Sequence, residues 1–411
     1  MIFSSRAPVG YVVIAGNPVS TNQGCKNLIL SDGVFNEYVY YYLKGSKSLA
    51  ESYASGTTFL ELSSKAFGRL PIPLPPLNEQ RRIVEKIEEL FTKLDAGVRS
   101  LKQTQALLKS YRRSVLKAAV EGELSREWRE AHRDEIEPAS ELLERILQER
   151  REKFAGKRYK EPAFPDTSEL LALSEGWKWA SIDQITNNHD GRRIPVKRSD
   201  RDNMEGEYPY YGASGIIDYV DDYLFDGEFL LIAEDGANLL TRSTPIAFRA
   251  SGKFWVNNHA HIVQTYAAVP LQYLEIFLES INLQFFVTGS AQPKLTQANL
   301  NRISAPLPPL KEQLFIVEEV ERRLSVVDKL EATVEANLKQ AGGLRQSILK
   351  QAFSGELVPQ DADDEPASVL LERIREERQA TKQKAGNKRA RAKRKVPAGD
   401  QTPELFPEQG V

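Results

Sequence analysis

The sequence predicts an α+β fold in which two domains of mixed helix and strand, the first one partial, are joined by two long helices that form an antiparallel coiled coil. Three observations predict it. The phrase LPPLNEQRRIVE at residues 74–85 returns as LPPLKEQLFIVE at residues 307–318. Apolar residues follow each copy at intervals of seven, as in a coiled coil. Short β-like runs separated by turns precede the second copy.

The bulk composition admits two or three domains. The chain has 411 residues and a net charge of −2, from 55 Lys and Arg against 57 Asp and Glu. Because the positive and negative charges nearly balance, the net charge neither favours nor excludes nucleic-acid binding, which depends on how the charged residues are distributed over the surface. The single cysteine, Cys25, excludes an intramolecular disulfide and fits a cytoplasmic protein. We expect neither a secretory signal nor a membrane span, since the apolar runs that either needs are missing.

The two copies match well beyond the opening phrase. Residues 122–124 and 355–357 both read GEL, and residues 138–140 and 366–368 both read PAS. The chain is therefore a tandem duplication of one unit, a globular part followed by a long helix. We divide it into a partial first domain (1–74), a first long helix (75–124), a connector with a short helix (125–175), a second domain (176–305), a second long helix (306–357) and a C-terminal segment with a short helix and a basic tail (358–411).

The long helices are predicted from their ends and their period. Pro75 and Pro76 block helix upstream and preset the first turn, and Gly122 is a natural stop. Each helix spans roughly 40 residues, or ~60 Å. An alternative is two amphipathic helices that pack only on their own domains. The predicted seam of the coiled coil consists of Ile87, Leu94, Leu101, Leu108 and Val115 in the first helix and Val320, Val327, Val334, Ala341 and Ile348 in the second.

The second domain alternates β-like runs with turns. They read EFLLIA (228–233), TPIAF (244–248) and KFWVNNHAHIV (253–263), and an amphipathic helix follows at 270–281. The first domain matches only the later half of this pattern, because residues 19–30 align with residues 254–265. It lacks a counterpart of about residues 177–224, and half a sheet rarely folds alone.

Together these motifs resemble the specificity (S) subunit of Type I restriction–modification systems. The resemblance is carried by LPIPLPPLNEQRRIVEKIEELFTKLD, APLPPLKEQLFIVEEVERRLSVVD and the helix endings KAAVEGEL and KQAFSGELV, with FSSRAPVGY (3–11) and YPYYGASGIIDYV (208–220) as pieces of target-recognition domains. It covers nearly the whole chain. The first domain departs from the family pattern, because it has no counterpart of the front of the second domain.

The resemblance implies a chain without catalytic activity of its own. Its two target-recognition domains would each read half of a bipartite site in double-stranded DNA. Its helices would fix their separation and dock two methyltransferase (M) subunits, with restriction/translocase (R) subunits completing a hetero-oligomer. S-adenosylmethionine, Mg²⁺ and ATP would then belong to those partners. Because the coiled coil has a fixed length, the distance between the two target-recognition domains would set the spacing of the half-sites. A duplicated chain can also present similar faces to two copies of one partner.

Candidate DNA contacts are polar or basic residues in predicted loops and strands. The stretch DGRRIPVKRSDR (190–201) is basic and loop-like, and Arg and Lys neutralise phosphates while Arg and Asn can read base edges. The alternatives are a solvated loop and, for the tyrosines, a place in the core. The predicted DNA-binding residues are Arg192, Arg193, Lys197, Arg198, Arg201, Tyr210, Tyr211, Ser214, Asn257, Asn258, His259, Lys294 and Gln297 in the second domain, and Ser5, Arg6, Asn22, Gln23 and Lys26 in the first.

Two further features are weaker signals. One strand is predicted to hold Asn257, Asn258, His259 and His261. Its two histidines would share a face, which suggests metal binding. Because the sequence offers no third ligand, we predict no metal site. The basic segment 382–395 is expected to be disordered, serving either nonspecific phosphate binding or solvation alone.

Enzymatic activity of the chain itself is disfavoured. An adenine methyltransferase would carry an Asn/Asp-Pro-Pro-Tyr/Phe motif, whereas the Pro-Pro pairs here precede leucine, and no Walker A loop is present. Two alternatives stay open: the recognition subunit of a Type IIG/B-like enzyme, and a coiled-coil scaffold that reads no sequence.

Overall fold

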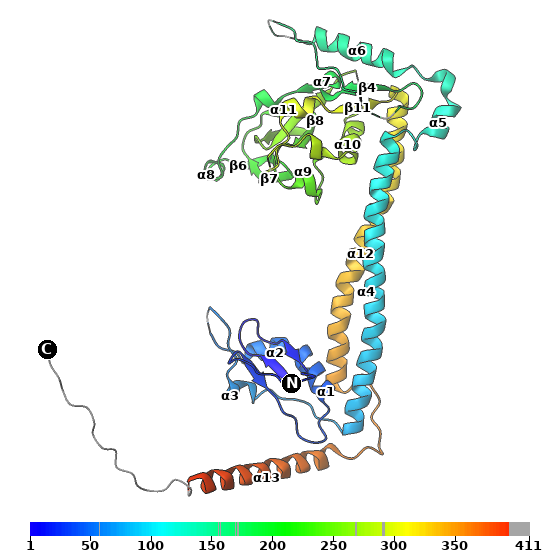
Figure 1. Cartoon of the computed structure of the whole chain (residues 1–411). Coiled ribbons are helices and arrows are strands. Elements are labelled where there is room, and N and C mark those ends of the chain that lie inside the picture. The colour runs from blue at the N-terminus through cyan, green and yellow to red at the C-terminus, as the bar shows by residue number, and fades with distance from the viewer. Residues whose placement is uncertain are drawn as a thin grey trace, which may run out of the picture. The chain divides into compact units, whose positions relative to one another are not determined.

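The computed structural model describes residues 1–393 apart from residues 57, 155, 157, 169, 171, 268, 290 and 291 (Figure 1). The chain divides into two compact units. Unit 1 comprises Met1–Lys102 and Glu335–Val411, and unit 2 comprises Gln103–Val334. Each of the two long helices, α4 (Leu77–Val120) and α12 (Leu310–Ser354), begins in one unit and ends in the other. No helix in the described part of the chain combines the length and apolar character needed to cross a membrane.

Unit 2 is built on a six-stranded sheet of order β5-β10-β8-β9-β6-β7. Neighbouring strands are antiparallel except β6 and β9. A separate pair joins β4 (Lys178–Ser181) to β11 (Ser304–Leu307). The six strands are β5 (Thr186–Asn188), β6 (Glu205–Gly212), β7 (Gly215–Val220), β8 (Phe225–Ala233), β9 (Ala247–Val256) and β10 (Ala260–Thr265).

The core of unit 2 lies between this sheet and helix α10 (Leu271–Ser280). Leu230, Ile232 and Val263 of the sheet belong to the same buried cluster as Leu274 and Phe277 of α10. Burying each such side chain contributes about 1.5–3 kcal/mol. Unit 2 also holds the 14-residue helix α6 (Ala139–Glu152). Its shorter helices are α5 (Arg126–Ala131), η1 (Arg133–Glu135), α7 (Ile182–Ile185), η2 (Asp190–Arg192), α8 (Arg198–Arg201), α9 (Asn238–Thr241), η3 (Leu283–Phe285) and α11 (Gln297–Asn301).

Two predicted elements of the second domain are confirmed, whereas only Ala247 and Phe248 of the run 244–248 belong to a strand, because β9 begins at Ala247. The run 228–233 lies within β8, and the amphipathic stretch 270–281 contains α10. The run 253–263 is not one strand, however, because β9 ends at Val256 and β10 begins at Ala260. The prediction that Asn257, Asn258 and His259 lie on a strand is therefore wrong. They form a turn in which Asn257 Oδ1 accepts the His259 N–H at 2.8 Å, as Asn commonly does.

Unit 1 holds a three-stranded sheet of order β2-β1-β3, from β1 (Ile2–Ser4), β2 (Val12–Val13) and β3 (Cys25–Asn27). Phe3 pairs with Val12 and Lys26, as Ile232 at the centre of unit 2 pairs with Ala247 and His261. The first domain thus reproduces the β9-β8-β10 part of the larger sheet. Its helices are α1 (Asn36–Gly45), α2 (Lys47–Ser52) and α3 (Ser64–Phe67).

Although partial, the first domain has a core because the long helices close it. Phe3, Tyr38 and Leu62 share one buried cluster with Ile87 of α4 and Ile348 of α12. The last helix, α13 (Ala367–Lys393), also differs from the prediction, since it includes most of the segment expected to be disordered from Lys382. Residues 394–411, with the end of the basic tail, lie outside the described residues.

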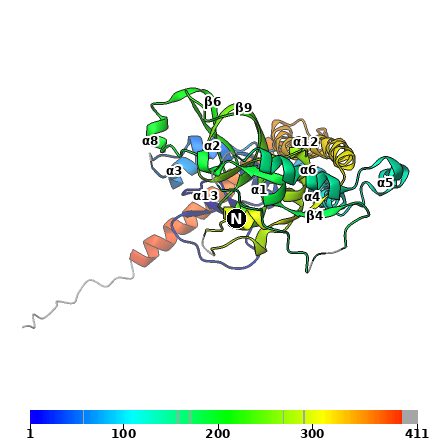
Figure 2. The same cartoon turned by 90° about the horizontal axis from the view of Figure 1, so that it is seen from above.

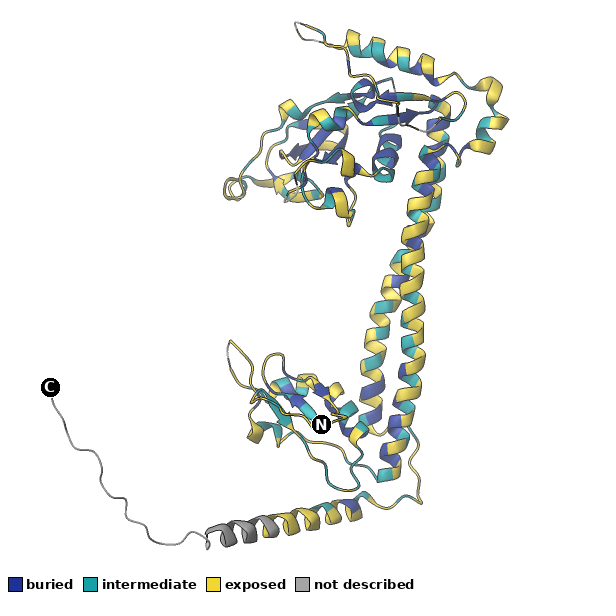
Figure 3. Ribbon diagram, viewed as in Figure 1, coloured by how far each residue is buried: buried dark blue, intermediate teal, exposed yellow. Residues whose placement is uncertain are grey.

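The two long helices pack against each other in antiparallel fashion within each unit (Figures 1 and 2). In unit 1, Arg345 of α12 pairs with Asp95 of α4, and in unit 2 Arg112 of α4 pairs with Asp328 of α12. Residues late in one helix therefore meet residues early in the other. Every residue of the predicted seam is buried or half-buried, and the outward helix faces are exposed (Figure 3).

Candidate nucleic-acid interface

The basic stretch 190–201 separates into buried and exposed cations. The Arg193 side chain is 13% exposed and donates to Glu234 Oε2 at 2.6 Å and to the Ala260 carbonyl at 2.7 Å. Arg201 is 12% exposed, donates to Asp218 Oδ2 at 2.8 Å and lies over the Tyr210 ring. These two guanidinium groups are committed to the fold, so their prediction as DNA contacts is not supported.

The remaining cations of the stretch face solvent. Arg192 is exposed but anchored, because it donates to the Leu224 carbonyl at 3.0 Å and lies over the Phe225 ring. Lys197 and Arg198 are exposed and make no ion pair within the described residues. A cation without a protein partner can neutralise a phosphate at little cost, and this leaves Arg192, Lys197 and Arg198 as the candidates of the stretch.

The two tyrosines predicted to bind DNA lie largely in the core. Tyr210 is fully buried and its hydroxyl accepts the Val196 N–H at 3.0 Å, so it is not available to DNA. Tyr211 is half-buried against Phe248 and Phe254, and burial raises the pKa of its hydroxyl. Ser214 is exposed in the turn between β6 and β7. Sequence inspection missed the exposed apolar side chains of the adjacent β7, which are Ile216, Ile217 and Tyr219.

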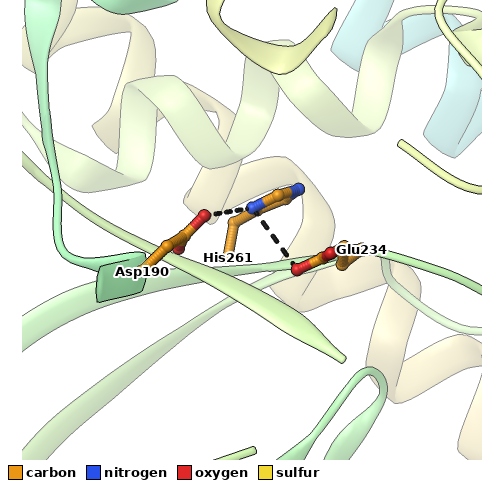
Figure 4. Close-up of side chains that lie close together, drawn as sticks. All are labelled: Asp190, Glu234 and His261. Atoms are coloured by element: carbon orange, nitrogen blue, oxygen red, sulfur yellow. Dashed lines mark hydrogen bonds and ion pairs between the residues drawn. The ribbon is translucent and has the colours of Figure 1, made fainter. Parts of the chain in front are cut away.

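A buried ionic cluster of unit 2 brings together Asp190, Glu234 and His261 (Figure 4). His261 Nδ1 lies 2.5 Å from Asp190 Oδ2 and 3.7 Å from Glu234 Oε2. Its Nε2 lies 2.8 Å from the carbonyl oxygen of Leu295. Both ring nitrogens of His261 therefore have an oxygen partner.

The same cluster lowers the pKa of both carboxyl groups. Burial raises the pKa of Asp190, but the hydrogen bond and charge of His261, with the Ile262 N–H and Arg193, outweigh burial and lower it overall. Burial likewise raises the pKa of Glu234, and its bonds to Arg193 and Lys294 bring it below the usual value. Both groups are therefore held as carboxylates.

Asp190, Glu234 and His261 could each offer one ligand atom to a metal ion. Two cations already occupy Glu234, however, with Lys294 Nζ at 3.0 Å and Arg193 at 2.6 Å, and both His261 nitrogens are engaged. This favours a structural ion-pair network over a metal centre. The idea that His259 and His261 share a face is wrong, because His259 is exposed in the turn and lies 2.8 Å from Asp235 instead.

Several other predicted contacts are accessible. Asn258 and His259 are exposed in the turn after β9, Gln297 is exposed at the start of α11, and Lys294 is half-exposed beside Glu234. Asn257 is buried, with its side chain committed to the turn. Asn258 and His259 therefore lie between the end of β9 and the start of β10.

In unit 1, Arg6, Asn22 and Gln23 are exposed and Lys26 is half-buried. Ser5 is buried and donates to the Gly24 carbonyl at 3.0 Å, so it is not available to DNA. Asn22 Oδ1 accepts the Gly24 N–H at 2.9 Å, which repeats the turn made by Asn257 in unit 2.

The strand registers identify equivalent positions in the two units, and different side chains occupy these positions. Lys26 stands where unit 2 has His261. The bridge between Arg6 and Glu61 stands where unit 2 has the bridge between Asp235 and Lys294. One backbone frame thus presents two different sets of polar groups.

Comparison with known proteins agrees with this duplicated architecture. The family model described as "Type I restriction modification DNA specificity domain" matches residues 1–103 and 174–340. The chain is 42% identical over 151 residues to a putative type I restriction enzyme specificity subunit of Haemophilus influenzae, a match that covers 36% of this chain and 38% of that protein. It is 27% identical over 385 residues to the EcoKI specificity subunit of Escherichia coli, covering 88% of this chain and 75% of that one.

A solved structure from a study of assembly and conformational transition of the type I R-M system shares the fold. Its TM-score is 0.56 at 18% identity, over 78% of this chain and 71% of that chain. Because the family model covers both copies of the duplicated unit and more than half of the chain, the protein belongs to the family of Type I restriction–modification specificity proteins.

Proposed function

We propose that the chain is the non-catalytic DNA-recognition subunit of a Type I restriction–modification system and that it reads a bipartite site. The observation that carries the proposal is the presence of the DNA specificity domain on both halves of a duplicated chain. A chain with two such domains can contact two short blocks of sequence, one with each domain.

The differences between the two domains support two different half-sites. Their strand registers are equivalent, yet exposed Glu61 of unit 1 stands where unit 2 has exposed Lys294. Lys donates to guanine, Asn and Gln pair with adenine, and carboxylates accept from cytosine. Equivalent positions with unlike donors and acceptors are therefore suited to reading unlike bases.

The exposed residues divide by chemistry into two roles. Arg192, Lys197 and Arg198 supply positive charge for phosphates, which provides affinity and register without sequence information. The exposed polar groups near the turns supply candidates for base reading; these are Ser214, Asn258, His259 and Gln297 in unit 2 and Arg6, Asn22 and Gln23 in unit 1.

The proposal assigns the chemistry to other chains. Two methyltransferase (M) subunits would dock on the duplicated chain, whose two similar halves suit two copies of one partner. Restriction/translocase (R) subunits would complete the assembly in the cytoplasm. S-adenosylmethionine, Mg²⁺ and ATP would be bound by those subunits.

The test is a methylome. The chain is co-expressed with its cognate methyltransferase subunit in a methylation-deficient host, and modified adenines are mapped by long-read sequencing. One bipartite motif is the expected result, and it also yields the spacer length. Modification of a single half-site would confine recognition to one domain, and failure of the two chains to form a complex would refute the proposal.

A further inference from the structure

The turn between β9 and β10 carries a histidine that a carboxylate holds in place. His259 Nδ1 lies 2.8 Å from Asp235 Oδ2 and 3.0 Å from Asp235 Oδ1. The side chain of His259 is 48% exposed, whereas that of Asp235 is 15% exposed. The pair therefore consists of a sheltered acid and an imidazole that solvent reaches.

The backbone on both sides of this pair is fixed by the fold. The His259 carbonyl accepts the Glu234 N–H at 2.9 Å, and the His259 N–H donates to Asn257 Oδ1 at 2.8 Å. Asp235 forms an isolated β-bridge with Lys294. A side chain that is ordered before binding loses less conformational entropy when it binds, so this imidazole is preorganised for a contact.

The contact with Asp235 decides which ring nitrogen carries the proton. An ionised carboxyl group only accepts hydrogen bonds, so its partner Nδ1 has to donate. In a neutral imidazole the other nitrogen, Nε2, is then an acceptor. Nε2 of His259 makes no hydrogen bond or ion pair within the described residues. The ring therefore offers one unpaired acceptor.

The cations of the neighbouring segments do not compete for Asp235. Lys294 Nζ lies 3.0 Å from Glu234 Oε1, and Arg193 donates to Glu234 Oε2 at 2.6 Å. Among the residues that the structure describes, His259 is the one side chain that pairs with the Asp235 carboxylate. Asp235 is thus dedicated to orienting the imidazole.

Unit 1 has no histidine at the equivalent place. Its Ser5 N–H bonds the Gly24 carbonyl at 2.8 Å, as the Glu234 N–H bonds the His259 carbonyl in unit 2. Gly24 also directly precedes β3, as His259 directly precedes β10, and these two strands occupy equivalent places in their sheets. Gly24 is therefore the equivalent of His259 and brings no side chain.

Arg6 lies beside this place instead. A Cβ atom at Gly24 would lie 3.7 Å from Arg6 Cδ. The bridge of Arg6 with Glu61 stands where unit 2 has the bridge of Asp235, and Arg6 Nε lies 3.1 Å from Glu61 Oε1. Because arginine only donates, unit 1 presents donors where unit 2 presents an acceptor, and such donors suit O6 and N7 of guanine.

We propose that His259 is a specificity-determining residue of unit 2 and that its Nε2 accepts a hydrogen bond from the amino group of adenine or cytosine in the major groove. The inference rests on the proposed function and names the base chemistry that the second domain reads. In this groove adenine N6 and cytosine N4 donate, whereas guanine and thymine present only acceptors and the thymine methyl group. His259 thus selects adenine or cytosine on the strand that it contacts. Asp235 is a positioning residue that holds the proton on Nδ1.

The first experiment changes the histidine. The unaltered chain, His259→Ala and His259→Lys are each co-expressed with the cognate methyltransferase subunit in a methylation-deficient host, and modified adenines are mapped by long-read sequencing. With the unaltered chain, one position of one half-site should carry adenine or cytosine on one strand. In His259→Ala the preference at that position alone should fall about 10-fold. In His259→Lys, whose ammonium only donates, the same position should change to guanine.

The second experiment tests the positioning role of Asp235. Asparagine keeps the size of the side chain but can also donate, so Asp235→Asn no longer fixes the proton on Nδ1. The preference at the position that His259 reads should weaken, with the rest of the motif and the melting temperature unchanged. Asp235→Glu, which keeps the carboxylate, should retain part of the preference. The control Ser251→Ala, a change at an exposed residue of β9, should leave every position unchanged.

The outcomes separate this inference from the proposed function. A bipartite motif that both His259 variants leave unaltered would overturn the inference while the proposed function stands. Guanine or thymine at the position that changes would overturn it as well, because the ring would then be donating. An equal decrease of modification at all sites in Asp235→Asn would show that Asp235 is only structural. A complex of the unaltered chain that yields no motif would refute the proposed function and the inference together.

Discussion

Replacing Glu312 by glutamine tests how the buried carboxylate stabilises unit 2. The carboxylate accepts from Ser125, Arg129 and Trp177, and the Arg129 side chain is only 15% exposed. Glutamine keeps one acceptor but turns an amide N–H₂ toward donors, so at least one buried donor loses its partner. Breaking one member of a buried, charged network costs roughly 3 kcal/mol.

The matched control is the same change at Glu79. That carboxylate has no hydrogen-bond partner in the described structure, and its pKa is raised by burial. A group whose folded pKa is raised destabilises the fold above its ordinary pKa, so removing the charge at pH 7 relieves a cost. We therefore expect Glu79→Gln to leave the melting temperature unchanged or slightly higher. The same substitution should thus have opposite consequences at two equivalent positions.

Tryptophan fluorescence makes the assay specific for unit 2, because all four tryptophans, Trp128, Trp177, Trp179 and Trp255, lie in residues 103–334. A loss of ~3 kcal/mol in a unit of this size lowers the melting temperature by about 6–12 °C. Circular dichroism follows both units together. Equal shifts for Glu312→Gln and Glu79→Gln, or none for Glu312→Gln, would show that the three donors to Glu312 do not stabilise unit 2.

Three further predictions follow from other contacts. The pKa values of Asp190 and Glu234 are lowered in the fold, so these carboxylates stabilise unit 2 fully above the ordinary carboxyl pKa range and lose that effect as the pH falls through their folded pKa values. At pH values below about 4, the urea concentration at the unfolding midpoint of unit 2 should therefore decrease less steeply with pH in Asp190→Asn than in the unaltered chain. Equal slopes in the two chains would contradict this prediction. The double variant Lys197→Ala/Arg198→Ala should reduce the slope of log affinity for DNA against log salt concentration by about 0.9 for each lost phosphate contact. The control Lys339→Ala, a change at an exposed residue of α12, should leave the slope unchanged. An unaltered slope in the double variant would show that these two cations touch no phosphate. Proline at position 35 fits the backbone φ of −76°, but Phe35→Pro removes the N–H whose hydrogen bond Gln80 Oε1 accepts at 2.8 Å. The free energy of unfolding of unit 1, measured by hydrogen exchange, should therefore fall by about 1–3 kcal/mol. An unchanged free energy would show that this hydrogen bond is dispensable.

The two units already differ in whether the buried glutamine at this position accepts a hydrogen bond. Gln313 is the equivalent of Gln80, and each donates to a proline carbonyl five residues earlier. Gln313 Oε1 is buried without a donor, whereas Gln80 Oε1 accepts from Phe35. Pro270 precedes α10 as Phe35 precedes α1, and proline has no N–H.

The duplication, the two long helices and the resemblance to the family are readable from the residues alone. Repeated phrases are visible without coordinates, and a seven-residue period is a local property that survives any tertiary arrangement. The sequence also aligned Asn22 with Asn257, which make the same turn.

Which polar groups of the candidate interface are accessible depends on the packing of the folded chain. Arg193 and Arg198 are alike in sequence context, yet one bonds Glu234 and the other faces solvent. The partners of His261 come from Asp190 and Glu234 on other elements, so its role depends on strand order and register. Burial and ion pairing are set by residues distant in the chain, and a periodic pattern carries no record of them.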